Sequence, residues 1–113
     1  MDIKYAYRAV YNTAGEAIVV SLGWRYDKRH KKVQYAFAFQ SPNDQHCKRV
    51  ARWHINQRLS KRGEYDTFPM VSSDPGFSIP RKDMVEAEIW HKLAKSPAKG
   101  EPVKFGLARK SRV

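Results

Sequence analysis

The chain has 113 residues, of which 42% are apolar, enough to bury the core of one domain but not of two. Its 22 Lys and Arg against 11 Asp and Glu give a formal net charge of +11, which favours a polyanionic partner. The alternative is that the charge serves only solubility. The single cysteine, Cys47, excludes an internal disulfide and argues against a cysteine-based zinc site. No apolar run approaches the ~20 residues of a membrane span.

Three alternating stretches open the chain and predict strands at residues 3–11, 17–26 and 33–40. One face of the first strand is expected to hold Ile3, Tyr5, Tyr7, Ala9 and Tyr11. The corresponding faces of the other two hold Ile18, Val20, Leu22, Trp24 and Tyr26, then Val33, Tyr35, Phe37 and Phe39. Short connections make a three-stranded antiparallel meander the simplest topology.

Two helices are predicted to follow. The first has Ser41 as its N-cap and Pro42 in its first turn, and it runs to Arg62 before Gly63. The second spans residues 80–95. Both helices are expected to cover one face of the meander, which gives a single α+β domain (βββαα) over residues 1–95. Between them, residues 63–79 are expected to form a long irregular loop.

Residues 96–113 are predicted to form a flexible basic tail. Pro97, Gly100 and Pro102 interrupt regular structure, and residues 103–108 are compatible with one short edge strand. The cations of this region are Lys95, Lys99, Lys104, Arg109, Lys110 and Arg112, against Glu101 as the only acid. Basic tails of this kind commonly add phosphate contacts that do not depend on nucleotide sequence.

The first predicted helix combines an apolar arc with a polar stripe. The arc holds Cys47, Ala51, Ile55 and Leu59, and Val50 and Trp53 widen it. The opposite stripe holds Gln45, Arg49, Arg52, Asn56 and Ser60, with Lys48 at its margin and no acid to balance it. Arg and Asn contact phosphates and base edges, so we expect Lys48, Arg49, Arg52 and Asn56 to bind nucleic acid. The alternative is an ordinary solvated helix face.

A second basic group lies at the predicted hairpin between the second and third strands. Residues 25–32 carry five cations and one acid. Because a hairpin tip exposes its charges, we expect Lys28, Arg29, Lys31 and Lys32 to reach a phosphate backbone. The alternative is a flexible charged turn.

Two polar side chains, His54 and Arg58, fall on the helix face that should be buried. A buried guanidinium needs a partner, and we expect a carboxylate of Asp66, Asp83 or Glu86 to supply it. The alternative is a cleft in which His54 and Arg58 meet a phosphate.

Motifs for catalysis are missing from the sequence. The four histidines show no metal-ligand spacing, and Asp44 and His46, two residues apart, point to different sides of a helix. No glycine-rich phosphate loop, GxSxG motif or Cys–His motif occurs. Pro42-Asn43-Asp44 is similar to the opening of a nuclease signature, but no Glu-x-Lys follows in a downstream strand. We therefore expect a protein that is not an enzyme and has no cofactor or metal.

An aromatic strand ending at Phe39 leads into Pro42 and Asp44, then into Ala51-Arg52, Ile55 and Arg58-Leu59. In this stretch, residues 35–59, the chain resembles a group of small bacteriophage and prophage accessory proteins. In that group Gly stands at the position of Ala51 and Ala at that of Ile55. The resemblance covers about a quarter of the chain. It implies an accessory protein that binds nucleic acid or host machinery.

Charge and resemblance together predict a non-enzymatic nucleic-acid-binding accessory or regulatory protein of a phage or mobile element. The alternative is an inhibitor of a host nucleoprotein or defence complex, with the same surface contacting a protein. The opening residues, Met1 to Tyr5, lack the regions of a signal peptide, so we expect the cytoplasm of a bacterial host as location and no membrane contact. The choice between DNA and RNA, the strandedness of the ligand and the oligomeric state stay open.

Overall fold

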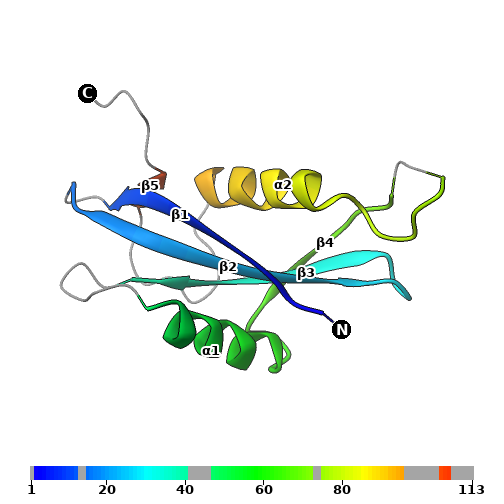
Figure 1. Cartoon of the computed structure of the whole chain (residues 1–113), viewed down its shortest axis with the longest axis horizontal. Helices are drawn as coiled ribbons and strands as arrows, with labels where there is room; N and C mark the ends of the chain where they lie inside the picture. The colour runs from blue at the N-terminus through cyan, green and yellow to red at the C-terminus, as the bar shows by residue number, and fades with distance from the viewer. Residues whose placement is uncertain (1, 13–14, 41–46, 73–74, 96–104, 108–113) are drawn as a thin grey trace.

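The computed structural model describes residues 2–12, 15–40, 47–72, 75–95 and 105–107 (Figure 1). The fold is α+β, with an antiparallel sheet and two helices. The strands are β1 (Lys4–Asn12), β2 (Ala17–Asp27), β3 (Lys32–Phe39), β4 (Asp66–Pro69) and β5 (Phe105–Leu107), in the order β4-β3-β2-β1-β5. The helices are α1 (Lys48–Leu59) and α2 (Lys82–Lys95). Neither described helix is long and apolar enough to cross a membrane.

The first three strands form the predicted antiparallel meander. β1 pairs with β2 so that Lys4 faces Trp24, and β2 pairs with β3 so that Trp24 faces Tyr35. The apolar sides of β2 and β3 lie on one face of the sheet, as the alternation predicts, and α2 packs against them. This main core contains Val10, Ile18, Val20, Leu22, Trp24, Tyr26, Val33, Tyr35, Phe37, Phe68, Val85, Ile89, Trp90 and Leu93.

The two helices lie on opposite faces of the sheet, so the prediction that both cover one face is wrong (Figure 1). On the second face Ile55 and Leu59 of α1 pack against Ala36, with Tyr5 and Tyr65 at the edges. Ala36 and Ala38 present only small side chains to α1, which lets the helix backbone approach the sheet closely. Where small residues alternate with large apolar ones along a strand, the side with the small residues is expected to face solvent. For this reason the sequence predicts no helix on the face that α1 covers.

β4 occupies part of the segment that was predicted to be irregular. Val33 pairs with Phe68, and the N–H of Met70 donates to the carbonyl of Lys31 (3.1 Å). Phe68 is buried and its ring lies 5.7 Å from that of Tyr35. The strand has only four residues and includes Pro69, which cannot donate to a ladder. Its pairing with β3 and the burial of Phe68 nevertheless hold it in the sheet.

The first helix is shorter than predicted. Cys47 is its N-cap and Ser60 its C-cap, and the Ser60 hydroxyl donates to the carbonyl of Gln57 (2.7 Å). Gly63 has a positive φ of 90°, but it lies three residues beyond the C-cap. The predicted N-cap region, including Ser41, Pro42, Asp44 and Gln45, lies outside the described residues.

Of the predicted tail, the structure describes residues 105–107 alone. These form β5, in which Leu107 pairs with Val10 and Phe105 with Asn12 of β1. The short strand falls within the segment 103–108. The other residues of the predicted flexible tail lie outside the described part of the chain.

Candidate nucleic-acid interface

One stripe of α1 faces two tyrosines of β1. Nε of Arg52 donates to the hydroxyl of Tyr7 (2.7 Å), and the guanidinium carbon lies 4.7 Å from the ring centre of Tyr5. Nζ of Lys48 lies 4.8 Å from the ring centre of Tyr7. The hydroxyl of Tyr5 donates to Oδ1 of Asn56 (2.6 Å). Residues four apart on a helix share one side, so Lys48, Arg52 and Asn56 form one edge of α1 beside β1.

This placement corrects the predicted far-side stripe. Arg52 and Asn56 remain exposed, but they lean over the sheet edge instead of pointing away from it. The alternation of the first strand placed Tyr5 and Tyr7 correctly on a shared face, yet gave no sign that cations would cover their rings. Because Arg52 is held by a hydrogen bond and by ring contacts, it loses little side-chain entropy when it binds an anion.

The outermost side of α1 is partly apolar. Val50 is 52% exposed and Trp53 is 58% exposed, and the Trp53 ring lies 5.0 Å from that of His54 at an interplanar angle of 80°. The predictions that Val50 and Trp53 widen the buried arc, and that Cys47 and His54 lie in the core, are therefore wrong. A helix lying on a sheet buries only a narrow strip, here Ala51, Ile55 and Leu59.

The two helices differ sharply in charge. Of the twelve residues of α1, four are Lys or Arg (Lys48, Arg49, Arg52 and Arg58) and none is acidic. α2 carries three lysines and three acids, and the pairs Lys82–Glu86 (3.1 Å) and Lys92–Glu88 (3.7 Å) neutralise part of this charge. Within the described residues, no carboxylate forms an ion pair with the first three α1 cations. Helix α1 therefore attracts anions more strongly than helix α2 does.

Arg58 lies on the other edge of α1 and points toward β3. Its Nη1 donates to the carbonyl of Phe37 (3.1 Å), and its side chain is half-buried. Two of the carboxylates proposed as partners, Asp83 and Glu86, belong to α2 on the opposite face, so that part of the prediction is wrong. Glu86 instead accepts a hydrogen bond from the indole N–H of Trp24 (2.9 Å).

The basic hairpin tip is organised by Asp27. Its Oδ1 accepts hydrogen bonds from the backbone N–H groups of Arg29 (3.1 Å) and His30 (3.3 Å), and its Oδ2 lies 2.7 Å from Nδ1 of His30. The side-chain hydrogen bond with His30 is the main reason why the pKa of Asp27 is lowered. Lys31 has a left-handed backbone (φ 53°) that closes the turn. The turn leaves Lys28, Arg29, Lys31 and Lys32 exposed.

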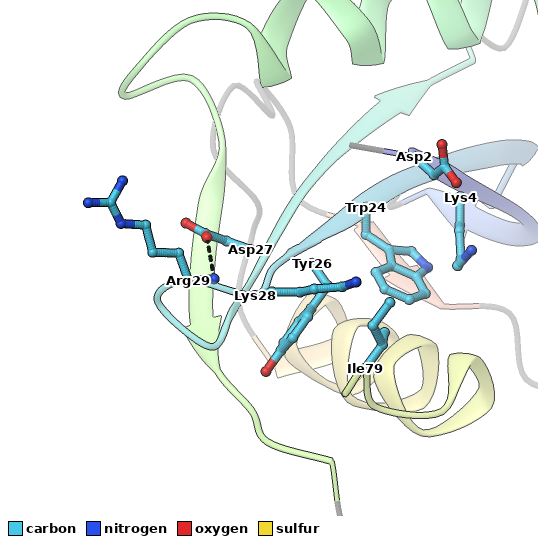
Figure 2. Close-up of a pocket in the computed structure, with 8 residues that line it drawn as sticks. All are labelled: Asp2, Lys4, Trp24, Tyr26, Asp27, Lys28, Arg29 and Ile79. Atoms are coloured by element: carbon cyan, nitrogen blue, oxygen red, sulfur yellow. Dashed lines mark hydrogen bonds between the residues drawn. The ribbon is translucent and has the colours of Figure 1, made fainter. Parts of the chain in front are cut away.

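A cavity of ≈ 520 Å³ lies beside this tip (Figure 2). Lys28 and Lys4 line it with Trp24 and Tyr26, whereas the guanidinium of Arg29 points away from the two rings (Figure 2). The remaining lining residues are Asp2, Asp27 and Ile79. Trp24 and Tyr26 belong to the core on the α2 side, so the cavity opens on that face of the sheet.

The predicted site residues therefore form two groups. Lys48, Arg49, Arg52 and Asn56 lie on the α1 side, whereas Lys28, Arg29, Lys31 and Lys32 are exposed at the β2–β3 turn, where Lys28 and Arg29 line the cavity. The sequence alone does not indicate that Lys4, Tyr5 and Tyr7 lie beside these groups. The pairing of β1 with β2 brings these residues there. Lys4 lies opposite Trp24, which lines the cavity, and Tyr5 lies opposite Gly23, which lies beneath α1.

Among the residues that the structure describes, no three His, Cys, Asp or Glu side chains are grouped so that they could hold a metal ion. The chain matches no protein-family model, and no curated protein or solved structure is significantly similar to it.

Proposed function

We propose that the protein is a non-enzymatic nucleic-acid-binding accessory or regulatory protein of a phage or mobile element, and that α1 makes the principal contact. The observation that carries this proposal is the charge of α1, which has four cations and no acid. In α2, by contrast, three acids balance the three lysines. Clustered cations bind a phosphate backbone because they release its condensed counterions. The phage or mobile-element setting follows only from the resemblance expected from the sequence of residues 35–59.

The cationic surface continues past the end of the helix. Lys61 and Arg62 are exposed and directly follow Ser60, the C-cap of α1. A backbone lying along α1 would therefore meet Arg49 and Arg52 first and these residues next. In this arrangement we expect the arginines to contact phosphates as forked donors and the Asn56 amide to contact a base edge.

A second candidate function is inhibition of a host nucleoprotein or defence complex through protein contacts. The observation that favours it is the exposed apolar pair Val50 and Trp53 on the outermost side of α1. Exposed tryptophan beside arginine is the composition of many protein-interface hot spots. The same face would then contact a protein and not a phosphate backbone.

The decisive experiment measures binding of the purified protein to labelled single-stranded and duplex oligonucleotides over a range of salt concentrations. If α1 cations neutralise phosphates, log K falls with log salt, by roughly 0.9 per phosphate on duplex DNA. The Arg49→Ala/Arg52→Ala variant is expected to lose about 1–3 kcal/mol of binding free energy. A matched control, Arg81→Ala/Lys92→Ala, removes the same charge near α2 and is expected to change affinity much less.

Two results would contradict the proposal. One is an affinity that hardly changes between low and physiological salt. The other is an equal loss of affinity from the α1 variant and from the α2 control, because net charge alone would then explain binding. Capture of a host protein complex that survives nuclease treatment, without measurable oligonucleotide binding, would favour the inhibitor function.

A further inference from the structure

The exposed tryptophan of α1 is unusual among the tryptophans of this chain. Trp24 is 1% exposed and Trp90 is 6% exposed, so both belong to the core, whereas Trp53 is 58% exposed. Trp53 precedes the buried Ile55 by two residues, which places it about 200° around the helix axis. It therefore lies almost opposite the buried strip and is among the first side chains of α1 that a ligand meets.

The surroundings of Trp53 are cationic. Arg49 lies one helical turn earlier and is exposed, and Arg52 is held in place by Tyr7 and Tyr5. The ring of His54 lies nearly perpendicular to that of Trp53, with the two ring centres 5.0 Å apart. Aromatic rings flanked by cations are the combination with which proteins bind single-stranded nucleic acid, because every base offers a face for stacking.

Duplex nucleic acid suits this surface less well. In a duplex each base face is covered by its neighbours, so stacking on a protein ring requires an unpaired base or costly unstacking. A single strand can place a base on the ring and its flanking phosphates on the neighbouring cations at the same time.

We infer that the ligand of the α1 face is single-stranded nucleic acid, one base of which stacks on the indole of Trp53 while Arg49 and Arg52 contact the flanking phosphates. This inference rests on the proposed function and names the class of nucleic acid that α1 binds. Within α1, the sequence alone predicts a binding role for the polar stripe, and the inference extends that role to Trp53.

Tryptophan fluorescence tests the inference directly, because Trp24 and Trp90 are shielded by the core and act as internal references. Titration with an oligothymidylate is expected to quench the emission of Trp53, and the single strand is expected to bind more tightly than a duplex. Trp53→Ala is expected to remove the quenching and to weaken single-strand binding roughly 5- to 150-fold. Duplex affinity should change little.

Two control variants separate stacking from general apolar contact. Val50→Ala removes a neighbouring exposed apolar group without removing a ring, and it should leave single-strand affinity nearly unchanged. Trp53→Phe keeps a smaller ring and should recover part of the affinity that Trp53→Ala loses. Since both positions are exposed, the melting temperatures of all three variants should match that of the wild type within a few degrees.

The failure of this inference is distinguishable from failure of the proposed function. If the protein prefers duplex, or if Trp53→Ala keeps full single-strand affinity while Arg49→Ala/Arg52→Ala loses it, stacking is refuted and nucleic-acid binding stands. If neither single strand nor duplex binds in a salt-dependent way, both proposals are overturned. If Trp53→Ala instead abolishes nuclease-resistant capture of a host protein and leaves nucleic-acid affinity intact, Trp53 belongs to a protein interface and the inference is wrong.

Discussion

Gly23 of β2 lies directly beneath Ile55 of α1, so close that a β-carbon on Gly23 would overlap Cγ2 of Ile55. The same β-carbon would also touch the ring of Tyr5, 3.4 Å from Cδ1. The missing side chain at Gly23 thus sets how closely α1 approaches the sheet. The approach in turn brings Arg52 within hydrogen-bonding distance of Tyr7, so a glycine in the sheet helps to place the candidate interface.

Replacing Gly23 by Ala is therefore expected to lower the free energy of unfolding by about 1–3 kcal/mol, because the added methyl group overpacks the α1–sheet contact. Urea denaturation measures this loss. Gly76→Ala is the matched control, since among the described residues beyond its chain neighbours no atom lies within 4 Å of a β-carbon at that position. Gly23→Ala should cost less in an Ile55→Ala background, where Cγ2 is absent. If Gly23→Ala lowers the free energy of unfolding equally in the wild type and in the Ile55→Ala variant, the contact between Gly23 and Ile55 does not limit how closely α1 packs on the sheet.

Arg25 is expected to stabilise the fold, although it belongs to the basic hairpin sequence. Its Nη2 donates to the carbonyl of Leu59 at the end of α1 (2.6 Å), and its Nε donates to Oε1 of Gln34 (2.6 Å). Arg25→Ala should lower the free energy of unfolding by about 1–3 kcal/mol, because a charged donor to a helix end is lost. Lys28→Ala, at the exposed tip, should stay within about 0.5 kcal/mol of wild type. Similar melting temperatures for the two variants would disprove this division of roles.

The buried phenol of Tyr35 predicts a loss of stability at alkaline pH. Burial, followed by the nearby charges of Asp66 and Glu88, raises the pKa of Tyr35 from 10.0 to about 12. Between these two values the unfolded chain releases a proton that the folded protein retains, so stability falls as pH rises from about 10 to 12. Below pH 10 the contribution is fully present.

The measurement compares melting temperatures of wild type and Tyr35→Phe across this alkaline range. Lysine deprotonation affects both proteins, so the difference between them isolates Tyr35. The wild type should lose more stability than Tyr35→Phe as pH rises. Parallel curves would mean that Tyr35 does not couple ionisation to folding.

The hairpin and the helix are expected to contribute differently to binding. Lys28→Ala/Lys32→Ala should weaken binding similarly for all oligonucleotides and flatten the salt slope, because tip lysines act as point charges on phosphates. Arg49→Ala/Arg52→Ala should also reduce any preference among sequences. Lys31 is left unchanged because its backbone is left-handed, so a substitution there would change the stability of the turn as well as its charge. Identical effects of the two variants on affinity, salt slope and sequence preference would remove the distinction.

The strands and their main buried side were determined by the sequence itself. In β2 the residues Ile18, Val20, Leu22 and Trp24 recur with a period of two, and this period permits only one face to be buried when the strand is extended. The short connection through residues 28–31 then requires β2 and β3 to be antiparallel. The apolar spacing of Ala51, Ile55 and Leu59 likewise predicted the buried strip of α1.

Only the tertiary structure decided which face of the sheet α1 covers, and hence which of its residues form the interface. Gly23 and Ala36 carry almost no hydrophobic signal along the chain, yet together they make the shallow surface on which Ile55 packs. Because a sheet contacts only a narrow strip of a helix, Trp53 became exposed, while Arg52 came to rest on Tyr5 and Tyr7 of a strand 45 or more residues away in sequence. Local periodicity describes the sides of one element, but contacts between distant elements depend on how the surfaces fit in three dimensions.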